Sequence, residues 1–187
     1  MIILLSGWAG SGKDAAAELL VEEMGFERLA FADALKEEVS KAMQIPLSFF
    51  RDRILKDRHL ESHGASPREL LIRHAAIRKQ EDHDIYSRIV AAHIQERSRS
   101  PSRSPSRSIV ISDWRYRHEY AFLKETLHDT VLVRGRITRA SITPTDDTPE
   151  HDLDEEAMDF MIANDGSISD LRDLLKKEIR KYYVHCK

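Results

Sequence analysis

The strongest constraint on the fold is a glycine-rich segment that follows the first apolar run of the chain. Ile2 to Leu5 is continuously apolar, as in a buried parallel strand. It leads directly into Gly7-Trp-Ala-Gly10-Ser-Gly12-Lys13-Asp14, and a helical pattern from Ala15 to Met24 follows, closed by Gly25. Glycines let backbone N–H groups converge on an anion, and the helix N-terminus adds positive charge. The sequence therefore predicts a phosphate-binding loop between a buried strand and a helix.

This loop fits the P-loop pattern Gly-x-x-x-x-Gly-Lys, so we expect it to bind ATP. Lys13 would supply a point charge to the β- and γ-phosphates. Asp14 stands where a serine or threonine usually holds Mg²⁺, and a carboxylate suits that ion as well as the first turn of a helix. The residues expected to bind ATP through the loop are Gly7, Gly10, Ser11, Gly12, Lys13, Asp14 and Ala15.

Strand and helix patterns alternate along the rest of the chain. Ser66-Pro67-Arg68-Glu69 predicts a helix start with a capping box, and Ser167-x-x-Asp170 predicts the start of the last helix. Asp33 is expected to cap a helix that runs to Met43. Further strands are expected at 26–31, 109–113, 130–133 and 160–162, and further helices at 84–96 and up to about 127. This alternation predicts an α/β fold with a parallel sheet and right-handed crossovers.

Composition limits the class of protein. A chain of 187 residues is expected to form one domain with its own core, and its single cysteine, Cys186, excludes an internal disulfide. The start of the chain lacks a signal-peptide pattern, and no apolar run is long enough for a membrane span, so an intracellular, cytoplasmic location is expected. Residues 97–108 read RSRSPSRSPSRS, and removing their four arginines takes the formal charge from −3 to −7. An acidic body argues against a nucleic-acid partner.

Phosphoryl transfer depends on positioning and on charge neutralisation, so carboxylates at strand ends and arginines outside the loop matter. Asp113 follows an apolar strand, where it could hold Mg²⁺ or its waters. Arginines gather around one helix and around the polar segment 135–157, which is expected to be a mobile lid. Arg68, Arg73 and Arg78 lie on or near the helix, and Arg134, Arg136 and Arg139 enter the polar segment. Arg115 stands apart, two residues after Asp113.

Five ordered segments resemble deoxynucleoside monophosphate kinases of phages and large DNA viruses. They are the loop with Gly-Lys-Asp, Phe31-Ala-Asp33-Ala-Leu-Lys36-Glu37, Ser66-Pro-Arg68-Glu-Leu-Leu, Ile111-Ser-Asp113-Trp-Arg115 and Ile162-Ala-Asn164-Asp-Gly166. Together they span about residues 2–175. The resemblance implies a three-layer P-loop NTPase fold, nucleoside monophosphate kinase-like. It also implies transfer of the γ-phosphoryl group of ATP to a dNMP, with Mg²⁺.

The resemblance also assigns site residues by position. Lys13, Asp14, Arg134 and Arg136 would be catalytic, and Asp14 and Asp113 would hold the metal. Asn164 and Gly166 would lie beside the adenine of ATP. The acceptor dNMP would be bound by Asp33, Lys36, Arg68, Arg78, Asp113 and Arg115. Within the single domain, the acceptor-binding helical region would cover about residues 33–96. Members of the family often form homodimers, so a homodimer is one expectation.

Two alternatives stay open. Animal-type phosphomevalonate kinase shares the Gly-Lys-Asp loop and similar later segments, and its acceptor is also a phosphomonoester. The chain could also be a non-catalytic nucleotide-binding module in which the arginine–serine tract 97–108 is the functional segment. The tract is not part of the family pattern, and Ala75-Ala76 stands where many relatives carry glycine.

The arginine–serine tract lacks apolar side chains, so it is expected to be a surface insertion. A sharper hypothesis makes Ser98 to Ser108 substrates of an SR-protein kinase. Each phosphate would add roughly −1.5 to −2 charges and reverse the sign of the tract.

Overall fold

A computed structural model describes residues 1–99, 108–143 and 151–183 of the chain. It divides into two compact units, which are described separately below. Unit 1 comprises Met1–Ala30 with His93–Lys187, and unit 2 comprises Phe31–Ala92.

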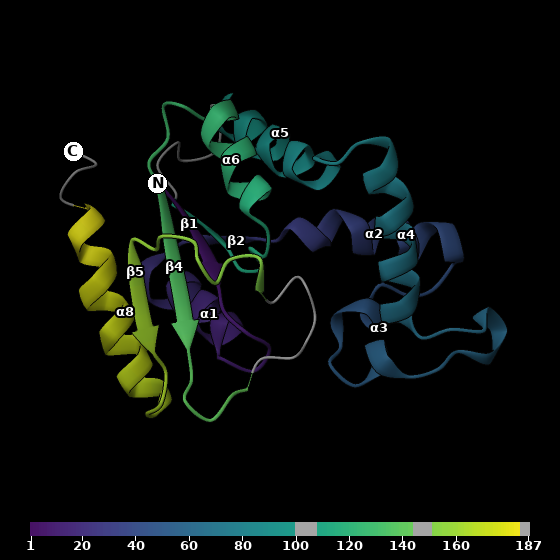
Figure 1. Ribbon diagram of the computed structural model, residues 1–187, viewed down its shortest axis with the longest axis horizontal. Coiled ribbons are helices and arrows are strands. Elements are labelled where there is room, and N and C mark those ends of the chain that lie inside the picture. Colours follow the sequence, from purple (N-terminus) through teal and green to yellow (C-terminus); the bar gives the residue numbers. More distant parts are fainter. Residues whose placement is uncertain (100–107, 144–150, 184–187) are drawn as a thin grey trace. The chain divides into compact units, whose positions relative to one another are not determined.

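The centre of unit 1 is a parallel sheet that has five strands in the described residues (Figure 1). The strands are β1 (Ile2–Ser6), β2 (Glu27–Leu29), β3 (Ile109–Ile111), β4 (Leu132–Thr138) and β5 (Phe160–Ala163). Their order is β2-β3-β1-β4-β5, and each paired neighbour is parallel. The chain builds one side of β1 first and then crosses to the other side, so β1 lies at the switch point of the sheet. Ligands of open α/β sheets bind at such a point, outside the carboxyl ends of the strands.

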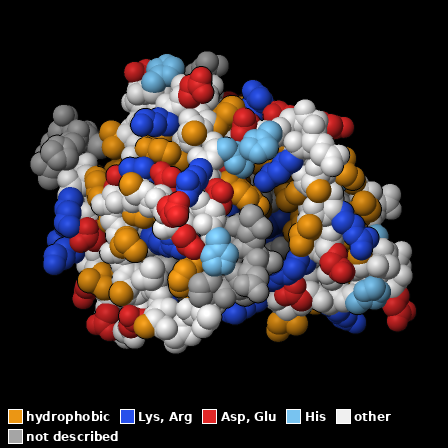
Figure 2. All heavy atoms as spheres, viewed as in Figure 1, with side chains coloured by type: hydrophobic (Ala, Val, Ile, Leu, Met, Phe, Trp, Pro, Cys, Tyr) orange, Lys and Arg blue, Asp and Glu red, His pale blue; other side chains and the backbone are white. Residues whose placement is uncertain are grey.

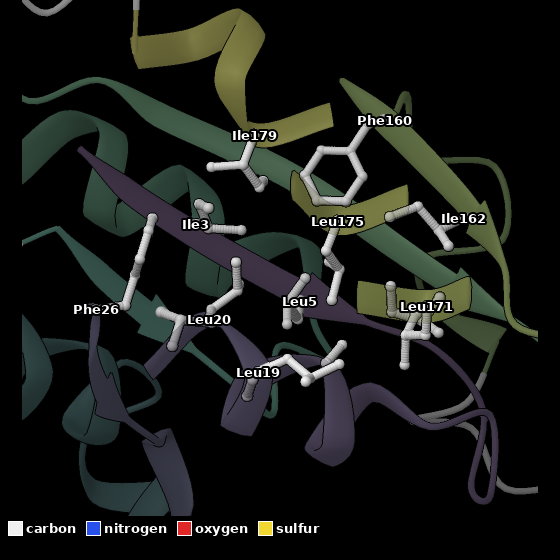
Figure 3. Packing of buried hydrophobic residues seen from close by; sticks show 14 of the residues in the cluster. Ile3, Leu5, Leu19, Leu20, Phe26, Phe160, Ile162, Leu171, Leu175 and Ile179 are labelled. Carbon is white, nitrogen blue, oxygen red and sulfur yellow. The ribbon is translucent and has the colours of Figure 1, made fainter. Parts of the chain in front are cut away.

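One face of the sheet is covered by α1 (Lys13–Met24) and α8 (Ile168–Tyr183), which contact each other. Figure 3 shows Ile3 and Leu5 of β1 pointing into a cluster between these helices and the sheet. Leu19 and Leu20 enter the cluster from α1, and further members enter it from α8. The labelled α8 members are Leu171, Leu175 and Ile179. This cluster fixes the start of α1, and with it the end of the glycine loop.

The opposite face of the sheet is equally buried. Successive strand residues point to opposite faces, so Ile2 and Leu4 lie away from the α1–α8 cluster, and both are buried. Arg134 pairs in register with Leu4, and its guanidinium lies 4.8 Å from the ring centroid of Tyr120. Tyr120 belongs to α6 (Arg117–Thr126), which therefore covers this second face.

Unit 2 is helical. Its longer elements are α2 (Phe31–Met43), α4 (Pro67–Glu81) and the first part of α5 (Ile85–Arg99), inside which the division between the units falls. Short elements join them: α3 (Ser48–Arg51) and the 3₁₀ turns η1 (Leu55–Asp57) and η2 (Glu61–His63). The Ser66 hydroxyl oxygen accepts a hydrogen bond from the Glu69 backbone N–H, and the Glu69 carboxylate accepts one from the Ser66 backbone N–H, so the predicted capping box is confirmed.

The α/β fold with a parallel sheet is confirmed, but two boundaries were wrong. The second helix begins at Phe31, so Asp33 is a first-turn residue and not its N-cap; its carboxylate pairs with Lys36 of the same helix at 3.0 Å. The fourth strand extends through Arg134 and Arg136 to Thr138, so the polar segment expected from residue 135 starts later. Pairing with β5 extends this strand, because Gly135 to Thr138 are the register partners of Phe160 to Ala163.

Within the described part of the chain, no helix combines the length and the apolar character needed to cross a membrane. The face shown in Figure 2 carries basic and acidic side chains next to one another. This mixture is consistent with the many ion pairs described below.

Candidate functional site

The glycine loop between β1 and α1 has the backbone of an anion-binding turn. Gly7, Gly10 and Gly12 all have positive φ, at 143°, 84° and 97°. The Ser11 N–H donates to the Trp8 carbonyl at 3.1 Å, which closes the turn. Gly12 is the N-cap of α1 and offers no side-chain acceptor to the first N–H groups of the helix. These N–H groups and the positive end of α1 favour a phosphate here.

Lys13, Asp14 and Ala15 form the first turn of α1. Lys13 is partly exposed and Asp14 is exposed, so both side chains can reach a ligand from solvent. Ala15 packs its side chain against the hydrophobic cluster, which leaves its backbone as the group that could contact a nucleotide.

Asp113 is held at the carboxyl end of β1, although it follows β3. The Ser112 N–H donates to Leu29 O at 3.1 Å, and the Trp114 N–H donates to Leu5 O at 3.2 Å. These two bonds tie the turn after β3 to the ends of β2 and β1, so Asp113 lies beside the start of the glycine loop. The structure thus brings Asp113 and the loop together.

The residues that follow Asp113 separate into buried and exposed ones. Trp114 is 1% exposed, and its Nε1 donates to Tyr116 O at 2.8 Å, so its ring is part of the core and not a platform for a base. Arg115 is exposed, and its backbone N–H donates to the buried carboxylate of Glu119. Burial, the largest effect, raises the pKa of Tyr116, and Glu119 adds to this rise.

Arg136 lies next to the glycine loop. It is 8% exposed and its guanidinium carbon is 5.5 Å from the ring centroid of Trp8, a loop residue. Nη1 donates to Leu153 O at 3.0 Å, and Nη2 pairs with Asp154. His151 Nδ1 lies 2.8 Å from the other oxygen of Asp154. Trp8, Leu153 and Asp154 are contacts that the sequence analysis missed, because no local spacing links them to Arg136.

Arg134 is committed to a different set of partners. Nε and Nη2 donate to the two oxygens of Asp159 at 3.1 Å each, and Nη1 donates to Glu156 at 3.1 Å. It pairs in register with Leu4, whereas Arg136 pairs with Ser6, the last residue of β1. Arg134 therefore lies two residues further from the carboxyl end of the sheet than Arg136.

The Arg134–Asp159 pair predicts a pH effect on stability. Burial alone would raise the pKa of Asp159, but hydrogen bonds from the Arg134 side chain and backbone outweigh it and lower this pKa. A lowered pKa stabilises the fold above the ordinary carboxyl pKa of about 4, and this contribution is lost as pH falls through the folded-state pKa. We expect Asp159→Asn to cost about 1–3 kcal/mol at pH 7.

The measurement is the free energy of unfolding by urea between neutral pH and pH ~2. The wild-type protein should lose stability more steeply on acidification than Asp159→Asn. Asp173→Asn, at an exposed position of α8, is the control. Equal slopes for wild type and Asp159→Asn would contradict the prediction.

The turn after β5 also reaches the glycine loop. Asn164 is 6% exposed, and its Nδ2 donates to Ser11 O at 2.9 Å. Its backbone N–H donates to Thr138 O at 2.7 Å, and its carbonyl accepts from Arg139 Nε at 2.8 Å. Gly166 lies against Asp170, which is in the first turn of α8 and accepts a hydrogen bond from the Ser167 N–H. The structure thus brings Asn164 to the backbone of the loop.

The acceptor-side residues of unit 2 are engaged in ion pairs. Arg68 donates to both oxygens of Asp57, at 2.5 and 3.2 Å, in a pair that is about half exposed. Arg78 lies 3.5 Å from Glu38 of α2 and donates to Glu81 at 3.0 Å, and these partners raise its pKa. At a helix rise of about 1.5 Å per residue, the backbones of Arg68 and Arg78 lie roughly 15 Å apart along the axis of α4. They do not form one cluster.

Glu38 is a residue of unit 2 that the sequence analysis missed. It lies 3.2 Å from His74 Nε2 as well as near Arg78. The Tyr86 hydroxyl is buried without a hydrogen-bond partner among the described residues. Its burial, the larger effect, and the negative charge of Glu38 together raise the pKa of Tyr86 to about 12.

No family model matches the chain, and no curated protein matches it. Solved structures resemble it over almost its full length. One is an unliganded sugar kinase from Janibacter sp. HTCC2649, 16% identical, with 96% of this chain and 94% of that chain covered and a TM-score of 0.51. A gluconokinase from Sinorhizobium meliloti 1021 is 11% identical, with coverages of 96% and 91% and a TM-score of 0.51. A Thermus thermophilus protein is 18% identical, with 97% of each chain covered and a TM-score of 0.50. At these identities the likeness shows the fold, which is that of an α/β P-loop NTPase.

Proposed function

We propose that the chain is an ATP-dependent kinase that phosphorylates a deoxynucleoside monophosphate. The observation that carries this proposal is the glycine loop at the switch point of the sheet, with Lys13 and Asp14 after it and Asp113 beside it. The ordered resemblance to viral and phage dNMP kinases supports the acceptor class. The solved neighbours that carry the name of kinase support phosphoryl transfer to a small molecule.

The transfer would form a bond between the γ-phosphorus of ATP and an oxygen of the acceptor phosphate. The bond from the γ-phosphorus to the β–γ bridging oxygen would break, and ADP would leave. The second pKa of a phosphate monoester is about 6, so the acceptor oxygen is largely ionised at neutral pH and needs no general base. The chain must instead neutralise the charges of two anionic substrates.

Lys13 and Arg136 would meet that need in unit 1. Lys13 stands at the N-terminus of α1, and Arg136 lies against Trp8 of the loop. We retain Arg136 and not Arg134 for this role, because Arg136 pairs in register with Ser6, the residue before the glycine loop, whereas Arg134 pairs with Leu4.

The residues present also fit Mg²⁺. Asp14 and Asp113 offer carboxylate oxygens, the ligand type that this ion prefers, and the Trp114–Leu5 bond holds Asp113 beside the loop. These two residues would hold the ion or its waters. When bound, Mg²⁺ would neutralise part of the phosphate charge.

For the acceptor phosphate we propose Arg68 of unit 2, with Asp33 and Lys36 of the same unit as supporting residues. Arg115 belongs to unit 1, and its role stays a prediction of the resemblance. Arg68 and its partner Asp57 are about half exposed, so an anionic phosphate could replace the carboxylate in the same fork geometry. Arg78 would serve to order unit 2 through Glu38.

The test is ADP release measured with each dNMP, each ribonucleoside monophosphate, mevalonate phosphate and gluconate, compared with reactions that contain no acceptor. Turnover with one or more dNMPs is the expected result. Turnover with mevalonate phosphate or gluconate alone would contradict the acceptor proposal. ATP binding without turnover on any acceptor would contradict the kinase proposal and favour a non-catalytic module.

Residues 100–107 of the arginine–serine tract lie outside the described residues, whereas 97–99 and 108 are described. Ser108 is 9% exposed, and its carbonyl accepts from the Glu27 N–H at 2.9 Å. If an SR-protein kinase acts here, Ser98 to Ser106 are its proposed targets and Ser108 is not. Mass spectrometry of the protein from its native cells tests this, and unmodified serines throughout would contradict it.

A further inference from the structure

The side chain of Asn164 is built into the glycine loop. Its Nδ2 donates to Ser11 O at 2.9 Å across 153 positions of sequence, and the residue is 6% exposed. A Cβ placed on Gly12 would stand 2.1 Å from the same Nδ2. The amide of Asn164 therefore occupies the space beside Gly12, against the Ser11–Gly12 peptide.

This bond fixes the direction of a neighbouring N–H group. A trans peptide is planar, so the carbonyl of Ser11 and the N–H of Gly12 point in opposite directions. By holding the Ser11 carbonyl toward itself, Asn164 turns the Gly12 N–H away from β5. We propose that Asn164 is a positioning residue for the phosphate site: it presets the Gly12 N–H for an anion. This inference rests on the proposed function.

Asn164 is itself held rigidly. Its backbone N–H donates to Thr138 O at 2.7 Å, and its carbonyl accepts from Arg139 Nε at 2.8 Å. The next residue, Asp165, accepts from the Ala140 N–H at 2.7 Å. The turn thus joins the end of β4 to the loop after β1, and a fixed amide costs little ordering entropy when a ligand binds.

The bond requires a hydrogen-bond donor on residue 164. Ser11 O is an acceptor, so the group that meets it must donate. An ionised aspartate has the same shape, but it only accepts, and it would place a negative charge beside the phosphate. Asn164→Asp is therefore the sharpest variant. Asn164→Ala removes the bond without adding charge.

The experiment is titration calorimetry with ATP, GTP and inorganic tripolyphosphate, which has neither base nor ribose. We expect Asn164→Asp to weaken all three by a similar factor of about ten, and Asn164→Ala to weaken all three less. Ser169→Asp adds the same charge at an exposed position nearby, and binding should stay at the wild-type level. Melting temperatures show whether each variant is folded. If the Asn164→Asp protein does not fold, the test rests on Asn164→Ala.

Each other result has a definite meaning. Weaker binding of ATP with unchanged binding of tripolyphosphate would place Asn164 beside the adenine and overturn the positioning role. Unchanged binding of all three by both variants would also overturn it. A wild-type protein that binds neither ATP nor tripolyphosphate would overturn the proposed phosphate site, and this inference with it.

Discussion

Replacing Lys13 with alanine is expected to lower the rate of ATP-dependent phosphoryl transfer by about 10²–10³, with little change in stability. Lys13 is the first residue of α1, and the side chains that anchor this helix to the sheet are those of the buried cluster. Its ammonium group is the charge that the loop presents to the β- and γ-phosphates in the proposed site. Without Lys13, the negative charge that develops on the phosphate oxygens in the transition state would lose this positive partner.

The measurement is the rate of ADP release at saturating acceptor, with urea unfolding as the check on the fold. Lys177→Ala, at an exposed position of α8, is the matched control and should keep the wild-type rate. Full activity of Lys13→Ala would contradict the assignment of the glycine loop as the phosphate site.

Gly7→Ala is expected to have the largest effect on stability. Gly7 has φ 143°, a conformation that costs a residue with a side chain about 1–3 kcal/mol. A Cβ at Gly7 would also stand 2.3 Å from the Ile137 carbonyl oxygen of β4. That obstacle is backbone of a neighbouring strand and cannot rotate away, so overpacking adds about 1–3 kcal/mol. The total loss is roughly 2–6 kcal/mol.

Gly25→Ala separates the two contributions. Gly25 caps α1 with φ 68°, and a Cβ there would meet nothing within 4 Å. Its loss should be the conformational part alone, about 1–2 kcal/mol. Urea unfolding of both variants gives the comparison. An equal loss for Gly7→Ala and Gly25→Ala would show that β4 yields to the methyl group.

The parts of the fold that depend on local chemistry could be predicted from the sequence. The capping box at Ser66 and Glu69 forms between residues three apart, and Gly25 ends α1 because its left-handed φ needs no partner elsewhere. The strand at Ile2–Ser6 follows from its apolar run. For the capping box and for Gly25, the decisive interaction lies within one turn of chain or in the residue itself.

Interactions between distant segments could not be predicted. Arg134 and Arg136 alternate with Gly135 and Ile137, and this period of two fits the observed strand. The sequence alone instead predicts that these arginines begin a lid, because the residues that follow them are polar. Their carboxylate partners come from residues 154–159. The Asn164 bond to the loop spans most of the chain, so no spacing rule could have found it.

The buried serine at the start of β3 bears on how this fold accepts added sequence. Ser108 enters the sheet at the amino end of β3, whereas the glycine loop and Asp113 leave strands at the carboxyl end. Because all five described strands run in parallel, their amino ends lie on one side of the sheet and their carboxyl ends lie on the opposite side. A sequence joined at Ser108 can therefore lengthen, shorten or change its charge during evolution without rebuilding the loops that would carry the chemistry.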